Sequence, residues 1–125
     1  MKIISNFLLF YLLLSCVAVT SFFAWRCWPV KIHVQHIERI EKSFLPFHER
    51  MLCNAFQFNQ QKFEAYFAKA RRLFPLEVHD AGFGSCYYQT KIDGIVYKIW
   101  AGGMAEIRDG QNVKFYASDH DVTAS

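Results

Sequence analysis

Residues 79–86 bring together the side-chain types that a thiol enzyme uses. His79 and Asp80 precede the glycine-rich stretch GFGSC, which ends at Cys86. Thiol catalysis needs a thiolate paired with a base that a third group orients. His79 is close to Cys86 in sequence and falls in a predicted turn, and Cys–His pairs of this kind arise by chance. We therefore expect no enzyme activity and keep a Cys86 thiol enzyme only as the weakest alternative.

Histidines and acidic residues occur in two further places where a metal site is conceivable. His33 and His36 would share one face of a helix, and Asp119, His120 and Asp121 are consecutive near the end of the chain. A zinc site needs three or four ligands at suitable spacing, and neither group supplies them. We expect solvated surface positions here, with no metal and no cofactor.

The cysteines also permit a structural interpretation. Cys53 lies on or after a predicted helix and Cys86 begins a predicted strand. If the domain lies outside the cytoplasm, a disulfide between them would stabilise it by about 3 to 4 kcal/mol in the chain-entropy description. The alternative is two buried free thiols, as expected for a cytoplasmic domain.

The N-terminal segment is the strongest signal in the sequence. Ile3 to Trp25 form a run of 23 residues without charge, and about 20 apolar residues span a bilayer core as a helix. Trp25, Arg26 and Trp28 then suit the membrane–water interface. We expect residues 1–25 to form an uncleaved signal anchor. The alternatives are a cleaved signal peptide and a lipoprotein lipidated at Cys16, which follows Leu13-Leu14-Ser15.

Charge divides the chain after the anchor. Residues 26–76 carry nine basic and four acidic side chains, giving +5, and residues 77–125 carry four basic and seven acidic ones, giving −3. The basic part adjoins the predicted anchor and would be attracted to anionic lipid headgroups. No basic run exceeds Arg71-Arg72, so we expect no nucleic-acid partner.

Two helices are expected next. The first is predicted from a stripe of apolar residues at helical spacing, interrupted by Pro46: Ile37, Ile40, Phe44, Phe47, Met51 and Ala55. Asn59 can cap the second, and Pro75 should end it. Its apolar face is formed by Phe63, Tyr66, Phe67, Ala70, Leu73 and Phe74.

After Pro75 the apolar period changes to that of strands. Asp93-Gly94 suits a type I′ turn between two strands, with Ile92 opposite Ile95. Gly102-Gly103 should form a bulge or a longer loop that keeps Ala105 and Ile107 on the core face. Gly110 is predicted to close a three-residue loop, which would place Val113 and Phe115 on that same face.

The side of the sheet opposite the core carries the candidate interaction surface. Its predicted members are Tyr87, Lys91, Val96, Lys98 and Trp100. An aromatic patch rimmed by lysines suits protein binding. A second copy of the chain or the N-terminal segment could also cover it, and in each case this face is an interface. We expect a protein partner or a homo-oligomer.

These elements together predict an α+β fold: a transmembrane helix, then two helices packed on an antiparallel β-meander of about four strands. The expected organisation is an anchor at 1–25, a juxtamembrane stalk at 26–36, a domain at 37–118 and a polar tail at 119–125. This layout resembles that of type IV pilins and pseudopilins. The resemblance covers architecture only, because their processing motif, a Gly before an aromatic residue and a Glu shortly after, is absent.

The sequence therefore predicts a small single-pass protein of the bacterial inner membrane with a non-catalytic domain, which we place in the periplasm. A cytoplasmic orientation stays open, because Arg26, Lys31 and Arg39 follow the anchor. We expect the domain to bind another protein as an accessory subunit of an envelope assembly. The alternative is an envelope inhibitor or immunity protein that blocks one enzyme or toxin. No small-molecule substrate is evident.

Overall fold

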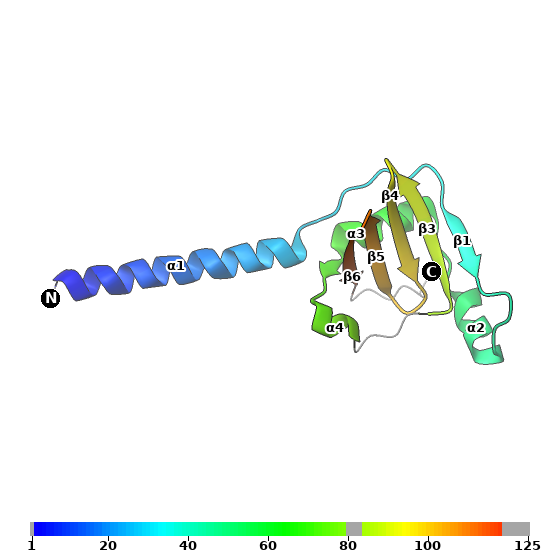
Figure 1. Cartoon of the computed structure of the whole chain (residues 1–125), viewed down its shortest axis with the longest axis horizontal. Helices are drawn as coiled ribbons and strands as arrows, with labels where there is room; N and C mark the ends of the chain where they lie inside the picture. The colour runs from blue at the N-terminus through cyan, green and yellow to red at the C-terminus, as the bar shows by residue number, and fades with distance from the viewer. Residues whose placement is uncertain (1, 80–83, 119–125) are drawn as a thin grey trace.

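The computed structural model describes residues 2–79 and 84–118. A long helix, α1 (Lys2–Cys27), projects from one end of an α+β domain (Figure 1). The domain contains three shorter helices, α2 (Phe47–Ala55), α3 (Gln60–Lys69) and α4 (Pro75–His79). Its six strands form one antiparallel sheet in the order β1-β3-β4-β5-β6-β2. The predicted fold class is confirmed, with six strands instead of about four.

The strands are short and follow the chain in a meander flanked by two edge strands. Their bounds are β1 (Glu38–Glu41), β2 (Arg71–Arg72), β3 (Cys86–Ile92), β4 (Ile95–Trp100), β5 (Met104–Asp109) and β6 (Asn112–Ala117). α3 lies across one face of this sheet and α2 lies at the end of the domain furthest from α1 (Figure 1).

The first predicted helix is wrong over most of its length. Residues 38–41 form strand β1 beside β3, and the helix begins only at Phe47, after Pro46. β1 ends at Glu41, and Pro46 is the N-cap of the helix, with φ −57° and ψ 156°, a conformation that starts a helix and does not continue one. The predicted core stripe is therefore divided, and its members Phe44, Phe47 and Met51 are exposed.

The segment predicted to be a stalk lies against the domain. The amide of Val30 donates a hydrogen bond of 3.2 Å to the carbonyl of Phe67 in α3. Further along, Val34 is buried in the core, and its amide donates to the Glu64 carboxylate at 2.7 Å. The chain leaving α1 is thus held along α3 before it enters β1.

The second helix starts as predicted and ends early. The side chain of Asn59 accepts a 2.8 Å hydrogen bond from the amide of Lys62, as an N-cap does. The helix ends at Lys69, because Arg71 and Arg72 pair with Ala117 and Tyr116 at the edge of the sheet. Pro75 begins α4, a favourable first helical position for proline.

The first hairpin of the meander matches the sequence analysis. Ile92 pairs with Ile95, and Asp93 and Gly94 have φ angles of 52° and 83°, as a type I′ turn requires. The loop at Gly102-Gly103 then brings Ala105 opposite Ile99. Ala105 is consequently on the core face, as the predicted longer loop demands.

The last hairpin differs from its prediction by one residue. Asp109 pairs with Asn112, so the loop contains only Gly110 and Gln111, and Gly110 has a φ of 61°. A change of one residue in register moves every side chain to the other face. Tyr116 therefore faces the core, and the prediction that Val113 and Phe115 do so is wrong.

The core lies between α3 and the sheet and is mostly aromatic. The ring of Phe67 has centroid distances of 5.4 Å to Tyr66, 5.5 Å to Tyr97 and 6.1 Å to Tyr116. The hydroxyl of Tyr66 donates to the carbonyl of Gly103 in the β4–β5 loop. Burial raises the pKa of Tyr66, so the phenol stays protonated and keeps this bond between α3 and the sheet.

Candidate interaction surfaces

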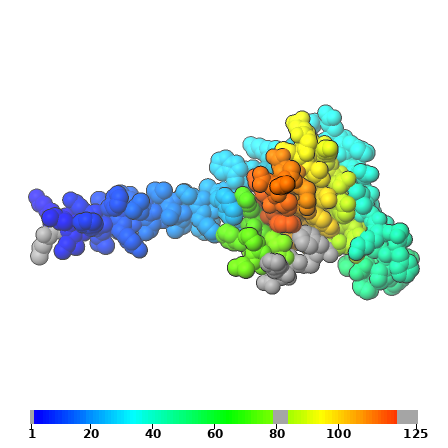
Figure 2. All heavy atoms as spheres, in the orientation of Figure 1, coloured from blue at the N-terminus to red at the C-terminus, as the bar shows by residue number. Residues whose placement is uncertain are grey.

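The sheet face opposite α3 gathers the five residues of the predicted interaction surface. Across β3 and β4, Tyr87 pairs with Trp100 and Lys91 pairs with Val96. The ring centroids of Tyr87 and Trp100 are 5.4 Å apart. The ammonium of Lys98 lies 5.0 Å from the Tyr87 ring centroid. Figure 2 shows this side of the domain. Apart from exposed Lys91, these side chains are half-buried.

The charges on this face are mixed. Glu106 lies across from Lys98, with only 6% of its side chain exposed, and accepts a 2.8 Å hydrogen bond from the Arg108 guanidinium. At the β1 edge, the amide of Gln89 donates to Glu38 at 3.4 Å. Cations and carboxylates thus both lie on this face, so its charge is mixed and not single-signed.

A second apolar surface was missed in the sequence analysis. We call it the α2 stripe: Phe44, Phe47, Met51 and Leu52. Phe44 and Phe47 are 80% and 76% exposed, and Met51 and Leu52 are each 58% exposed. The helical spacing was visible in the sequence, but it suggested a core face. Only the three-dimensional placement of α2 shows that the stripe faces outward.

Several contacts hold α2 on the domain with its apolar stripe outward. A disulfide joins Cys53 of α2 to Cys86 at the start of β3, with the two Cα atoms 6.0 Å apart. The guanidinium of Arg39 in β1 donates to the Cys53 carbonyl at 2.6 Å. The hydroxyl of Ser85 donates to Glu49 at 2.8 Å. A covalent bond and two hydrogen bonds therefore fix a helix that buries little apolar surface itself.

The junction between α1 and the domain contains the residues predicted for the membrane interface. Arg26 forms a bidentate ion pair with Glu77 of α4, with oxygen distances of 2.9 and 3.1 Å. The Phe74 ring stacks 5.3 Å from Trp25 and 5.7 Å from Phe22. Trp28, by contrast, is largely exposed. The last two turns of α1 are thus packed on the domain.

α1 is long and apolar enough to cross a membrane. It contains 26 residues, and none of them is buried inside the molecule. Cys16, the candidate lipidation site, is an exposed residue within this helix, and Cys27 is exposed at its end. A signal sequence near the N-terminus can meet the same criteria of length and apolar character, so the helix alone does not distinguish an anchor from a signal.

Cys86, the candidate nucleophile, is not a free thiol in the structure. The sulfur of Cys86 is bonded to Cys53, and only a free thiolate acts as a nucleophile. His79 is the last residue of α4, and Asp80 lies outside the described residues. The absence of enzyme activity stays a prediction.

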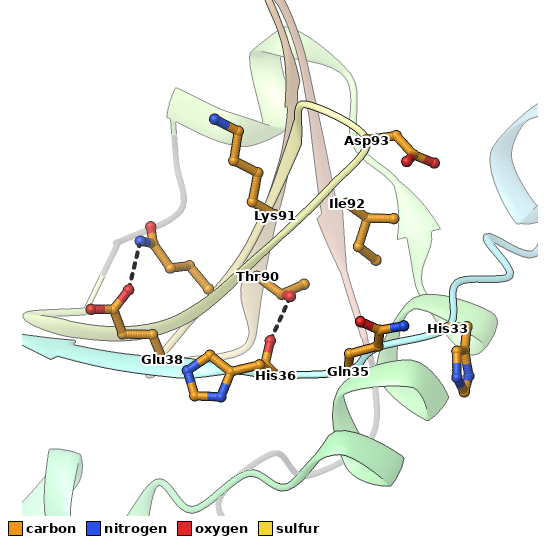
Figure 3. Close-up of a pocket in the computed structure, with 9 residues that line it drawn as sticks. His33, Gln35, His36, Glu38, Thr90, Lys91, Ile92 and Asp93 are labelled. Carbon is orange, nitrogen blue, oxygen red and sulfur yellow. Dashed lines mark hydrogen bonds between the residues drawn. The ribbon is translucent and has the colours of Figure 1, made fainter.

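The two histidines lie beside a polar hollow of about 560 Å³ between the segment 33–38 and the β3–β4 hairpin (Figure 3). His33 Nδ1 is 3.6 Å from Glu64, and the carbonyl of His36 accepts a 2.6 Å hydrogen bond from Thr90. Within residues 2–79 and 84–118, no three potential metal ligands come together. Residues 119–121, the other candidate group, lie outside the described residues.

Comparison with known proteins does not place the chain in a family. No protein family model, curated protein or solved structure matches the sequence or the fold. The function is therefore inferred from the surfaces described above.

Proposed function

We propose that the protein is a single-pass anchored subunit of the bacterial inner membrane whose periplasmic domain binds another protein within an envelope assembly. The anchor is α1, with its uncharged run of 23 residues. The packing of Phe22, Trp25 and Arg26 on the domain supports this assignment, because it joins the end of the helix to Phe74 and to Glu77 of α4.

The disulfide supports a location outside the cytoplasm. Cys53 and Cys86 are separated by 33 residues and are joined within the domain. Disulfides form and persist in oxidising compartments and are rare in the bacterial cytosol. An exported domain with a retained N-terminal helix is a periplasmic domain held at the inner membrane.

The observation that carries the protein-binding function is the α2 stripe. Four large apolar side chains are exposed to water on one short segment. Exposed apolar patches of this kind mark sites of interaction with other molecules. α2 lies at the end of the domain furthest from α1 (Figure 1), so a bilayer entered by α1 would not cover the stripe. A protein partner could bury it, as aromatic residues and methionine are enriched at such interfaces.

The charge pattern favours a structural subunit over an inhibitor. An inhibitor or immunity protein would be favoured by a strongly single-signed face. The sheet surface instead carries Lys91, Lys98 and Arg108 together with Glu106 and Glu38. Such a mixed, aromatic face suits a flat contact with another subunit.

Site-specific photocrosslinking in intact cells tests this function. We expect a photoreactive phenylalanine analogue at Phe47 to yield one discrete adduct, and the same analogue at exposed Gln61 of α3 to yield none. An adduct of twice the chain mass would identify a second copy as the partner. Absence of any adduct at Phe47, or equal adducts at both positions, would contradict a binding role for the stripe.

A polar variant of the stripe provides the matching loss-of-function measurement. We expect Phe47→Ser with Met51→Ser to reduce the crosslinked or co-purified partner at least tenfold, because buried apolar anchors dominate interface energies. Both side chains are exposed, so the free energy of unfolding should change by less than about 1 kcal/mol. Thermal unfolding of the variant serves as the control for folding.

A further inference from the structure

A cleft lies at the corner where α1 meets the domain. It has a volume of about 330 Å³ and is bounded by the last turn of α1, by β2, by α4 and by β6. Its walls are mainly apolar and include Trp25, Leu73, Pro75, Val78 and Val113. In Figure 1 this corner is the part of the domain nearest to α1.

Two cations also line this cleft. Arg72 in β2 pairs with Tyr116, and Lys114 precedes Tyr116 by two residues, so both side chains lie on the same face of the sheet. The Arg72 guanidinium lies 4.6 Å from the Trp25 ring centroid. A stacked guanidinium still presents its N–H groups at its edge, where a phosphate oxygen can accept them.

The positive charge in the cleft is not balanced within the part of the chain that the structure describes. Neither Arg72 nor Lys114 has an ion-pair partner among residues 2–79 and 84–118. Asp109 lines a neighbouring hollow together with Lys114, without forming an ion pair with it. At the same junction Arg26, in contrast, is paired with Glu77. The cleft therefore suits an anionic ligand.

The level of the cleft along α1 identifies the source of that anion. Trp25 is the last residue of the uncharged run and forms one wall of the cleft. Tryptophans are enriched at the level of the lipid headgroups. Leu76, on α4 beside the cleft, is 80% exposed, as suits a side chain that dips into the interface. When α1 spans the membrane, the cleft opens among lipid phosphates.

We propose that this cleft binds the headgroup of an anionic phospholipid, an inference that rests on the proposed membrane anchoring by α1. Arg72 and Lys114 contact the phosphate, and Trp25 and Val78 contact the first part of an acyl chain. The volume admits a headgroup and its glycerol but not a whole lipid, so the remaining acyl carbons stay in the bilayer. The bound lipid would fix the orientation of the domain on the membrane.

Native mass spectrometry of the full-length protein tests the proposal. The protein is first reconstituted into nanodiscs, and its co-elution with them tests the anchor separately. The detergent-solubilised protein is then titrated with phosphatidylglycerol and, in parallel, with phosphatidylcholine. We expect phosphatidylglycerol to bind about 30-fold more tightly than phosphatidylcholine. This factor corresponds to the summed electrostatic attraction of two basic residues for an anionic lipid.

Charge-matched variants locate the site. Arg72→Gln with Lys114→Gln should reduce the preference to less than about threefold. The control, Lys42→Gln with Lys62→Gln, removes the same charge from positions that do not line the cleft and should retain the full preference. Arg72→Lys keeps the charge and should retain most of it. Equal losses in the two double variants would overturn the proposal, because attraction would then depend on net charge alone.

A competition experiment separates a lipid from a free phosphate. Glycerol phosphate at the same concentration should displace little phosphatidylglycerol, because it lacks the acyl contacts with Trp25 and Val78. Full displacement by glycerol phosphate would show a soluble anion site and overturn the lipid assignment. Failure to enter nanodiscs, with the lipid preference intact in detergent, would contradict the anchor and leave the cleft assignment standing.

Discussion

Reduction of the Cys53–Cys86 disulfide is expected to lower the free energy of unfolding by about 3 to 4 kcal/mol. The bond closes a loop between residues 33 apart, and its loss restores that conformational freedom to the unfolded chain. Domains of this size are typically stable by about 5 to 15 kcal/mol, so the change is a large fraction of the total. Urea unfolding of the full-length protein in detergent, with and without reductant, measures it.

The same reduction should affect α2 more than the rest of the domain. Without the disulfide, α2 retains the hydrogen bonds from Arg39 and Ser85 but buries few apolar side chains. We expect amide exchange in residues 47–55 to accelerate by at least tenfold while α3 stays protected. Cys16→Ser with Cys27→Ser is the control and should change neither quantity. An unaltered exchange rate in α2 would contradict the role assigned to the disulfide.

Truncation of Phe67 to Ala is expected to cost about 3 to 5 kcal/mol of unfolding free energy. Phe67 is fully buried and its ring contacts Phe63, Tyr97 and Tyr116. The truncation removes these ring contacts and leaves a cavity between α3 and β4. Urea unfolding of the full-length variant in detergent gives the value.

Phe67→Leu is the control for this change. It keeps most of the apolar volume and should cost less than about 2 kcal/mol. The backbone carbonyl of Phe67 accepts the hydrogen bond from the Val30 amide, so a shift of α3 into the cavity should also loosen the segment that follows α1. A cost for Phe67→Ala below about 1 kcal/mol would show that α3 does not pack on the sheet in this way.

Local signals in the sequence were sufficient for the elements with strong turn chemistry. Asp93-Gly94 specified the hairpin of β3 and β4, and Asn59 specified the start of α3. The loop at Gly102-Gly103 followed from the requirement that Ala105 face the core. In each case one or two residues with special backbone preferences determined the outcome.

Two errors came from patterns that admit more than one structure. Ile37 and Ile40 fit a helical stripe, yet pairing of β1 with β3 places that segment in the sheet. The sequence around Gly110 allowed a loop of two or three residues, and the choice decided which of Phe115 and Tyr116 faces the core. Tertiary contacts settle such choices, and a single sequence does not contain them explicitly.

The candidate sites differ in how visible they were. The alternation in β3 and β4 predicted that Tyr87, Val96 and Trp100 share one face. The α2 stripe was visible only as a pattern with the wrong interpretation. The cleft depends on Trp25, Arg72 and Lys114, which come from three separate segments of the chain. No local pattern could have indicated that these side chains meet.

The arrangement of these surfaces suggests how an anchored subunit would work. α1 and the elements that bound the cleft, α4 and β6, lie at one end of the domain, and α2 lies at the other (Figure 1). A rigid junction at Arg26 and Glu77 would hold the stripe at a fixed height above the bilayer. A partner in the same membrane could then be engaged without a large loss of orientational freedom.

The most direct test of the central proposal is the intact mass of the protein extracted from membranes, measured before and after reduction. A retained anchor and an exported domain predict a full-length mass near 14.7 kDa and a gain of two hydrogen atoms on reduction. A shorter chain, or one that begins at Cys16 and carries lipid, would contradict the uncleaved anchor. A full-length mass with no gain on reduction would contradict the periplasmic placement of the domain.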